Sequence, residues 1–327
     1  MAEPPENPDA AGVDVSVLIV SYNTRELTLA ALEAVEAAIE AAPGTSFEVL
    51  VVDNSSEDDS AAAIAERFPG VRLLALDQNT GFARGNNLAA AKARGRYLLL
   101  LNPDTVVAPD ALGAIHAFAE ARPEAGIVGG RTTFADGSLN PTSCWARPTP
   151  WSTFCLGTGL TSLFRRSPLF DSESMGRWGR DDARQVDIVT GCFLLIRREL
   201  WDRLGGFDED FTMYGEDFDL SLRAAELGAE RWICPDAELV HLGGASERVR
   251  ADKMVRLFRA RAQLYRKHWG RFAAWFGVAM LDLWAFSRAM ALRLLSIVQP
   301  KRREGFETWR EILRRRREWH EPAGGER

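Results

Sequence analysis

The first 130 residues alternate short apolar segments with longer helix-forming segments, and this pattern restricts the fold more than any other feature of the chain. Alternating strands and helices form a mostly parallel sheet with right-handed crossovers. The strands contain few polar residues, which indicates a sheet covered on both faces. The predicted strands are 15–21, 47–52, 71–76, 96–101 and 126–130, and the predicted helices are 24–42, 60–68, 82–94 and 109–121.

The rest of the chain is less regular. Residues 132–186 lack clear periodicity and predict a long loop or lid. The tryptophans of this segment could stack on a sugar or pack a small separate core; they are Trp145, Trp151 and Trp178. Further on, we expect a strand at 188–196, short helices at 199–204 and from 216 to 227, a strand at 231–234 that Pro235 ends, and a continuous helical stretch over 252–298.

Polar residues follow each of the first four predicted strands. Ligands of parallel sheets bind beyond the carboxyl ends of the strands, so these residues are candidates for a binding site. Each could instead close a turn or cap the next helix. Because all four tips are polar, we predict a ligand site there, formed by Tyr22, Asn23, Asp53, Asn79, Gly81, Asn86, Asn102 and Asp104.

Carboxylates and one histidine suggest what such a site would do. Asp104 could bind a hard divalent cation, Mg²⁺ or Mn²⁺, which takes phosphate oxygens as further ligands, or it could cap a helix. Asp53 could accept hydrogen bonds from a nucleobase or ribose. His241, beside a glycine turn, could be a ligand or a structural residue. Three acids lie close together at the start of one predicted helix: Glu216, Asp217 and Asp219. They could simply stabilise the helix N-terminus, or one of them could be a general base.

Charge divides the chain into an acidic body and a basic tail. Residues 1–247 carry 20 Lys and Arg against 38 Asp and Glu, whereas residues 248–327 carry 20 Lys and Arg against 8 Asp and Glu.

Four widely spaced cysteines argue against a disulfide scaffold or a zinc ribbon. No uncharged apolar run reaches the ~18 residues of a membrane span, and the acidic N-terminus is unlike a secretory signal, so a cytoplasmic protein is expected. The expected domains are a disordered tail at 1–14, an α/β domain at 15–247 and a basic helical tail at 248–327.

The tail has a broad apolar face rich in Trp and Phe. Arg271, Asp282 and Arg293 recur every eleven residues and therefore share one polar helix face. With the basic segments around it, this face suits a helix lying on an anionic membrane surface, which predicts peripheral association with the inner face of the cell membrane. Packing on the body or at a subunit interface of a homo-oligomer is the alternative. Nucleic acid is not expected as a partner, because the arginine run lacks a recognition motif.

The sequence resembles glycosyltransferase family 2, in particular its bacterial rhamnosyltransferase-like branch, in several motifs and in their order along the chain. They span about residues 15–246, most of the acidic body, and the most specific are the NPD, GGFDE and GED segments. The matching stretches are VSVLIVSYNT (15–24), VVDNSSEDDS (51–60), NTGFARGNN (79–87), LLLLNPDT (98–105), TGCFLLIRRELWDRLGGFDEDFTMYGEDFDLSLR (190–223) and VHLGGAS (240–246).

The resemblance implies an α/β fold of the GT-A type, with a Rossmann-like sheet, and inverting transfer of a sugar from a nucleotide-sugar donor. It implies that Asp53 contacts the nucleobase or ribose and that Asp217 is the catalytic base. Asp104 takes the place of the metal-binding carboxylate, with His241 completing the metal or diphosphate site, while Asn102 stands where many relatives have Asp. We expect metal-dependent transfer, with rhamnose from dTDP-rhamnose as the first choice, to a lipid-linked or cell-surface glycan. The alternatives are a UDP-hexose transferase with a soluble acceptor and a silent nucleotide-sugar-binding scaffold.

Overall fold

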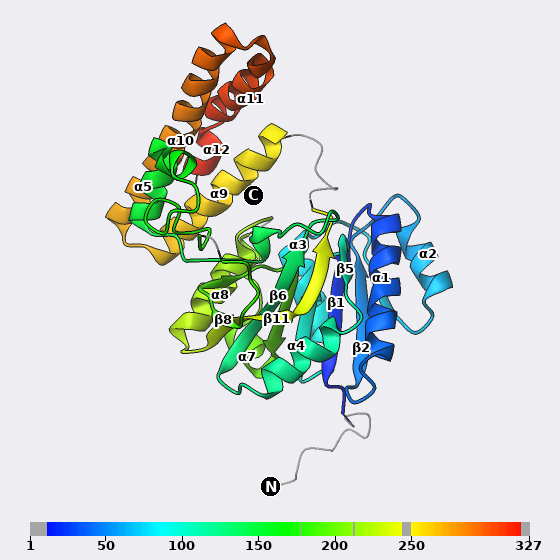
Figure 1. Ribbon diagram of the computed structural model, residues 1–327. Helices are drawn as coiled ribbons and strands as arrows, with labels where there is room; N and C mark the ends of the chain where they lie inside the picture. Colours follow the sequence, from blue (N-terminus) through cyan, green and yellow to red (C-terminus); the bar gives the residue numbers. More distant parts are fainter. Residues whose placement is uncertain (1–11, 177, 212, 244–249, 322–327) are drawn as a thin grey trace. The chain divides into compact units, whose positions relative to one another are not determined.

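The structure is a computed structural model that describes residues 12–176, 178–211, 213–243 and 250–321 (Figure 1). The chain forms two compact units. The first unit consists of Met1–Cys144, Gly179–Phe207 and Leu220–Ser246, and the second of Trp145–Trp178, Asp208–Asp219 and Glu247–Arg327. Most of the segment predicted to be disordered, 1–14, lies outside the described residues, as do residues 244–246 of the VHLGGAS motif.

The described part of the first unit is built on a nine-stranded, mixed sheet in the order β3-β2-β1-β4-β10-β6-β11-β5, with β8 paired to β11. β1, β2, β3 and β4 run parallel, while β10 lies antiparallel between β4 and β6. The expected Rossmann-like α/β fold is therefore confirmed. The strands are β1 (Val15–Ser21), β2 (Phe47–Asp53), β3 (Arg72–Ala75), β4 (Tyr97–Leu101), β5 (Thr105–Val107), β6 (Ala125–Thr133), β8 (Arg184–Gln185), β10 (Phe193–Arg197) and β11 (Glu230–His241).

Helices cover both faces of this sheet (Figure 1). Val17 and Ile19 of β1 point to one face and pack with residues of α1 and α4. Val20 points to the opposite face, where α3 approaches so closely that a Cβ on Gly85 would lie 2.9 Å from the Val20 Cγ1 atom. The helices are α1 (Arg25–Glu40), α2 (Ser60–Arg67), α3 (Phe82–Lys92), α4 (Ala111–Glu120), α7 (Arg198–Leu204) and α8 (Glu216–Glu226), the last of which begins in the second unit.

The predicted strands and helices of the first 130 residues are all present, with ends within three residues of the expected ones. Four later details differ. The strand expected at 188–196 is divided into β9 (Ile188–Val189), which belongs to a separate two-stranded sheet, and β10, which belongs to the large sheet. The sequence analysis missed β5, which is short. It ended a strand at Pro235, but β11 continues to His241 through a register shift between Cys234 and Glu238, where a bulge accommodates the missing proline N–H. The expected continuous helix over 252–298 is interrupted at Trp269 and Gly270.

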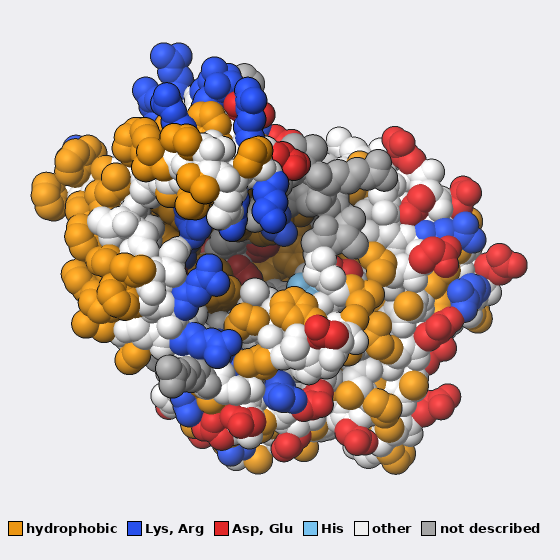
Figure 2. All heavy atoms as spheres, turned by 45° about the horizontal axis from the view of Figure 1, so that its top comes forward, with side chains coloured by type: hydrophobic (Ala, Val, Ile, Leu, Met, Phe, Trp, Pro, Cys, Tyr) orange, Lys and Arg blue, Asp and Glu red, His pale blue; other side chains and the backbone are white. Residues whose placement is uncertain are grey.

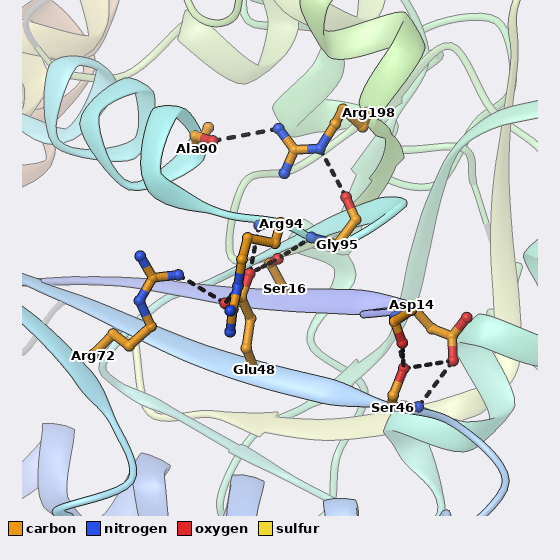
Figure 3. Close-up of polar contacts among 10 residues, drawn as sticks. Asp14, Ser16, Ser46, Glu48, Arg72, Ala90, Arg94, Gly95 and Arg198 are labelled. Carbon is orange, nitrogen blue, oxygen red and sulfur yellow. Dashed lines mark hydrogen bonds and ion pairs between the residues drawn. The ribbon is translucent and has the colours of Figure 1, made fainter. Parts of the chain in front are cut away.

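A buried carboxylate ties the strands together at their amino ends (Figure 3). Glu48 accepts hydrogen bonds from Ser16 Oγ at 2.6 Å, Arg72 Nη1 at 2.8 Å and Arg94 Nε at 3.0 Å. Burial by itself would raise the pKa of Glu48, but the hydrogen bonds from Ser16, from Arg94 and from Arg72 outweigh it and hold this pKa below its usual value. The charged Glu48 therefore stabilises the edge of the sheet opposite the strand tips.

The second unit is helical. A core of Phe258, Tyr265, Leu281, Ile312 and Trp319 joins its helices. The indole of Trp319 donates to Asp282 Oδ1 at 3.0 Å, so the end of the described chain is packed into the unit. No helix among the described residues is long and apolar enough to cross a membrane. The helices of the second unit are α5 (Pro150–Thr158), α6 (Leu160–Leu163), α9 (Arg250–His268), α10 (Arg271–Val298), α11 (Arg303–Arg314) and α12 (Arg317–His320). The chain also has two short strands that pair with each other, β7 (Cys144–Trp145) and β9 (Ile188–Val189).

The segment without predicted periodicity contributes α5, which begins with Pro150 and a capping box between Thr149 and Ser152. Its tryptophans differ in exposure. Trp178 is buried, whereas Trp151 is half-exposed and stacks on Phe154.

Candidate active site

The tips of β1, β2 and β4 lie at one edge of the sheet, because these strands run parallel. Ser21 at the end of β1 pairs with Asp53 at the end of β2, and β4 pairs with the other side of β1. Tyr22, Asp53 and Asn102 therefore lie along the same edge, where sheets of this kind bind ligands. Tyr22 is exposed.

Asp53 has an unsatisfied carboxylate oxygen at this edge. Its side chain is buried, and Oδ2 accepts a hydrogen bond from the backbone N–H of Ser56 at 3.1 Å. Oδ1 is buried and has no hydrogen-bond partner among the described residues. A buried acceptor without a partner costs free energy, so Asp53 is suited to receive a donor group from a ligand.

Asn54 shapes the loop between β3 and α3. Its Nδ2 donates to Asn79 Oδ1 at 2.9 Å and to the Gly81 carbonyl at 3.2 Å, and its Oδ1 accepts from the Thr80 N–H at 2.8 Å. Asn79 Oδ1 also accepts from the Gly81 N–H at 2.9 Å. Asn79 and Gly81 thus belong to a loop held from inside by Asn54. The sequence analysis did not select Asn54, although it directly follows Asp53.

Asn23 connects the tips of β1 and β2. Its backbone φ is 51°, in the left-handed region that asparagine tolerates. Its Oδ1 accepts from the Glu57 N–H at 2.8 Å, and its own N–H donates to Ser56 Oγ at 3.0 Å. The side chain therefore orders the loop after Asp53, and contact with a donor stays a prediction.

Two asparagines of the NTGFARGNN motif face into the protein. Asn86 is buried and donates to the Phe82 carbonyl at 2.9 Å within α3, so its role in donor binding stays a prediction. Asn87 Oδ1 accepts from the Phe207 N–H at 2.9 Å, and its Nδ2 donates to the Phe207 carbonyl at 3.0 Å. Next to it Gly206 has φ of 73°, and a Cβ there would lie 2.5 Å from Asn87 Oδ1. These contacts join the NTGFARGNN motif to the GGFDE motif.

Asp104 and His241 come together because β5 pairs with the end of β11. His241 lies opposite Thr105, and its Nε2 atom is 3.3 Å from Asp104 Oδ1. Both side chains retain a little solvent exposure. Nδ1 of His241 and Oδ1 of Asn102 are buried without a hydrogen-bond partner among the described residues.

This corner fits a divalent cation with few protein ligands. An oxygen and a nitrogen 3.3 Å apart can share one ion, whose ligands lie ~2.0–2.2 Å from it. The described residues contain no group of three or more His, Cys, Asp or Glu that could hold a metal ion. Mg²⁺ and similar ions commonly take one or two protein ligands, with water and substrate phosphates filling the remaining positions. Asp104 and His241 are thus a partial set that a diphosphate would complete.

The second unit contains the three acids at the start of α8, and their environments differ. Asp219 is fully buried; its Oδ1 lies 2.7 Å from Lys267 Nζ and 2.8 Å from His268 Nε2. Lys267 also pairs with Asp208. Asp219 therefore anchors α8 to α9 and is not available as a base.

Glu216 is also buried, and its Oε2 has no hydrogen-bond partner among the described residues. Burial, helped by the neighbouring charge of Asp217, raises the pKa of Glu216 to about 8, so this carboxyl is protonated at neutral pH. Of the three acids, Asp217 alone is partly exposed. Its Oδ1 accepts from the Phe218 N–H at 2.8 Å. The environments favour Asp217 as the base of this group.

Comparison with known proteins gives the family. The model of the glycosyl transferase family 2 matches residues 16–205. The N-acetylglucosaminyl-diphospho-decaprenol L-rhamnosyltransferase of Mycobacterium tuberculosis is 29% identical over 238 residues, covering 64% of this chain and 71% of that protein. Rhamnosyltransferase WbbL of Escherichia coli is 25% identical over 239 residues, covering 69% of this chain and 83% of that protein. The O-antigen biosynthesis protein RfbC of Myxococcus xanthus is 32% identical, but the match spans only 16% of that protein.

Solved structures agree on the fold. The mannosyltransferase PcManGT of Pyrobaculum calidifontis, in complex with GDP-Man and Mn²⁺, has a TM-score of 0.61 at 20% identity and is matched over 96% of this chain and 89% of its own. GalNAc-T7 with UDP, GalNAc and Mn²⁺ has a TM-score of 0.56 at 15% identity, over 84% of this chain and 52% of its own. The GT-A fold is therefore shared with proteins that were solved with a nucleotide and Mn²⁺.

Proposed function

The chain belongs to the glycosyl transferase family 2 and is a glycosyltransferase, and from this premise we propose that it transfers L-rhamnose from dTDP-rhamnose to a lipid-linked glycan with inversion. The observation that supports a nucleotide-sugar site is the cluster of unsatisfied polar atoms at one sheet edge: Oδ1 of Asp53, Oδ1 of Asn102 and Nδ1 of His241. The choice of rhamnose and of a lipid-linked acceptor follows the names of the similar proteins from M. tuberculosis and E. coli.

On the donor side, Asp53 accepts hydrogen bonds from the ribose or the base, since its free carboxylate oxygen is buried and already oriented. The next residue, Asn54, holds the neighbouring loop at 79–81 in place. Asp104 and His241 would hold a divalent cation, Mg²⁺ or Mn²⁺. When bound, such a cation offsets the negative charge that develops on the leaving diphosphate.

On the acceptor side, Asp217 takes the proton of the attacking hydroxyl. The hydroxyl oxygen forms a bond to the anomeric carbon while the bond from that carbon to the diphosphate oxygen breaks on the opposite face, which inverts the configuration. Asp217 suits this task because Glu216 is held protonated and Asp219 is bound to Lys267 and His268. Since the acceptor carries a lipid, we place the enzyme at the inner face of the cell membrane as a peripheral protein.

A thermal-shift screen tests the donor and the cation together, because a ligand that binds the native state raises its melting temperature. The panel contains dTDP-rhamnose, UDP-glucose, UDP-galactose and GDP-mannose, each with Mg²⁺, with Mn²⁺ or with a chelator. We expect the largest shift with dTDP-rhamnose and a cation. A larger shift with a UDP-hexose would refute the choice of rhamnose.

Asp104→Ala should remove the cation-dependent part of the shift, and His241→Ala should reduce it. The matched control is Asp110→Ala, which removes an exposed carboxylate six residues away in the same segment. Equal shifts for wild type and Asp104→Ala, with cation or with chelator, would show that Asp104 does not hold the metal.

A further inference from the structure

Helix α10 carries two apolar stripes on opposite sides. One stripe is buried and consists of Ala274, Val278, Leu281, Ala285 and Ala289, and all but Ala289 belong to the core of the second unit. The other stripe is exposed. Its residues follow one another at intervals of 3, 4 or 11 residues, which are whole helical turns to within a fraction of a residue, so they lie on one face of the helix. Its members are Phe272, Trp275, Phe286, Met290, Leu294 and Ile297.

The exposed stripe is more apolar than a surface helix requires. Phe272 is 80% exposed, Trp275 66% and Ile297 77%. A soluble helix buries one apolar stripe and shows a polar face to water, whereas α10 has already buried its stripe of small residues and Leu281. Trp284 of the same helix packs on Phe258 with ring centroids 4.9 Å apart. The core of this unit therefore does not account for the exposed stripe.

A second segment of the same unit adds exposed apolar side chains beside α10. Ser287 Oγ donates to the Gly157 carbonyl at 3.1 Å, and Arg288 Nη2 donates to Ser162 Oγ at 2.6 Å, which fixes α5 and α6 along α10. Just after Ser162, three large side chains are exposed: Leu163, Phe164 and Leu169. We call these residues together with the exposed stripe of α10 the apolar face. Figure 2 shows hydrophobic side chains gathered on the second unit, with Lys and Arg nearby.

Basic residues border the apolar face. Arg165 and Arg166 follow Phe164 directly and are exposed, and the exposed Lys301, Arg302 and Arg303 follow the end of α10. The one acid within α10 is Asp282, which is bound by Trp319 Nε1 at 3.0 Å and His320 Nε2 at 2.8 Å. The face therefore combines exposed aromatic and aliphatic groups with positive charge at its edges.

We propose that the apolar face docks on the surface of an anionic lipid bilayer, with its side chains at the level of the acyl boundary and the bordering arginines at the phosphates. Aromatic and aliphatic side chains with basic flanks are the features of helices that lie in a membrane interface. No described helix is suited to span the bilayer. A second copy of the chain fits less well, because it would bring two basic borders together. The proposal rests on the proposed function only for the reason to dock, which is access to a lipid-linked acceptor.

Co-sedimentation of the full-length protein with vesicles tests the proposal. One set of vesicles is pure phosphatidylcholine and the other contains phosphatidylglycerol. We expect binding to the anionic set, reduced but not abolished by salt, since salt screens only the electrostatic part. The double variant Phe272→Ser/Trp275→Ser should bind the anionic vesicles at least about tenfold more weakly than wild type. Its matched control is Phe134→Ser, which removes an exposed aromatic side chain of the first unit and should bind like wild type.

Replacing Lys301, Arg302 and Arg303 by Gln should weaken binding to anionic vesicles and reduce its salt dependence. Wild-type protein that stays in the supernatant with both sets of vesicles would overturn the proposal, as would equal weakening by Phe134→Ser. A concentration-dependent dimer that Phe272→Ser/Trp275→Ser abolishes, without vesicle binding, would assign the face to a second copy and also overturn it. The thermal shift with the nucleotide sugar is measured on the same samples. If the shift is present but the protein does not bind vesicles, only the docking proposal is rejected. If the shift is absent, the proposed donor site is rejected.

Discussion

Replacing Glu216 by Gln should remove a loss of stability that the wild-type protein undergoes as the pH rises from about 5 to about 8. Burial raises the pKa of this carboxyl from 4.5 to about 8 in the folded protein. Between these two values the unfolded chain has released the proton and the folded protein still holds it. The folded state then binds more protons, so its free energy of unfolding falls as the pH rises.

The size of this loss follows from the shift. Each pH unit between the two pKa values costs about 1.4 kcal/mol of unfolding free energy, so the total from pH 5 to pH 8 is on the order of 4 kcal/mol. Glutamine has nearly the same shape and does not ionise. The unfolding free energy of Glu216→Gln should therefore exceed that of wild type by an amount that grows with pH.

Urea denaturation at pH 5, 6, 7 and 8 measures the difference. The matched control is Glu199→Gln, which removes an exposed glutamate from the first turn of α7 and should leave the pH dependence of wild type unchanged. Parallel stability curves for wild type and Glu216→Gln would mean that Glu216 ionises normally in the fold. The argument that a protonated Glu216 leaves Asp217 as the base would then fail.

Three further predictions concern single carboxylates. Asp217→Asn should lower turnover by about 10²–10⁴-fold with little change in donor affinity; Asp210→Asn, exposed in the preceding loop, is the control, and similar turnover in both variants would exclude Asp217. Asp219→Asn removes the buried carboxylate that Lys267 and His268 share and should cost about 3 kcal/mol in urea denaturation, with a loss below ~1 kcal/mol counting against the anchoring role. Glu48→Gln should cost on the order of 2 kcal/mol at pH 7. Because the folded pKa of Glu48 is lowered, this cost should shrink as the pH falls below about 4.5, and a cost that is independent of pH would contradict the charged network.

The sequence alone determined the alternation of strands and helices, the polar strand tips and the family. These features depend on neighbouring residues: the apolar run at 15–21, the turn residues that follow it and motifs such as GGFDE are all contiguous. The parallel order of β1, β2 and β4 followed from that alternation, and it placed Tyr22, Asp53 and Asn102 at one edge as expected.

The tertiary structure decided which residues meet. His241 reaches Asp104 because β11 continues past Pro235 and pairs with β5, and a local reading of the sequence ends that strand at the proline. Asp219 resembled a candidate base until Lys267 and His268, almost fifty residues later, proved to hold it. The sequence likewise showed that α10 has a broad apolar face, but not which part of that face is covered. That depends on α9, α11 and α12, which supply Phe258, Ile312 and Trp319 to the core, because burial is set by contacts between segments and not by the periodicity of one helix.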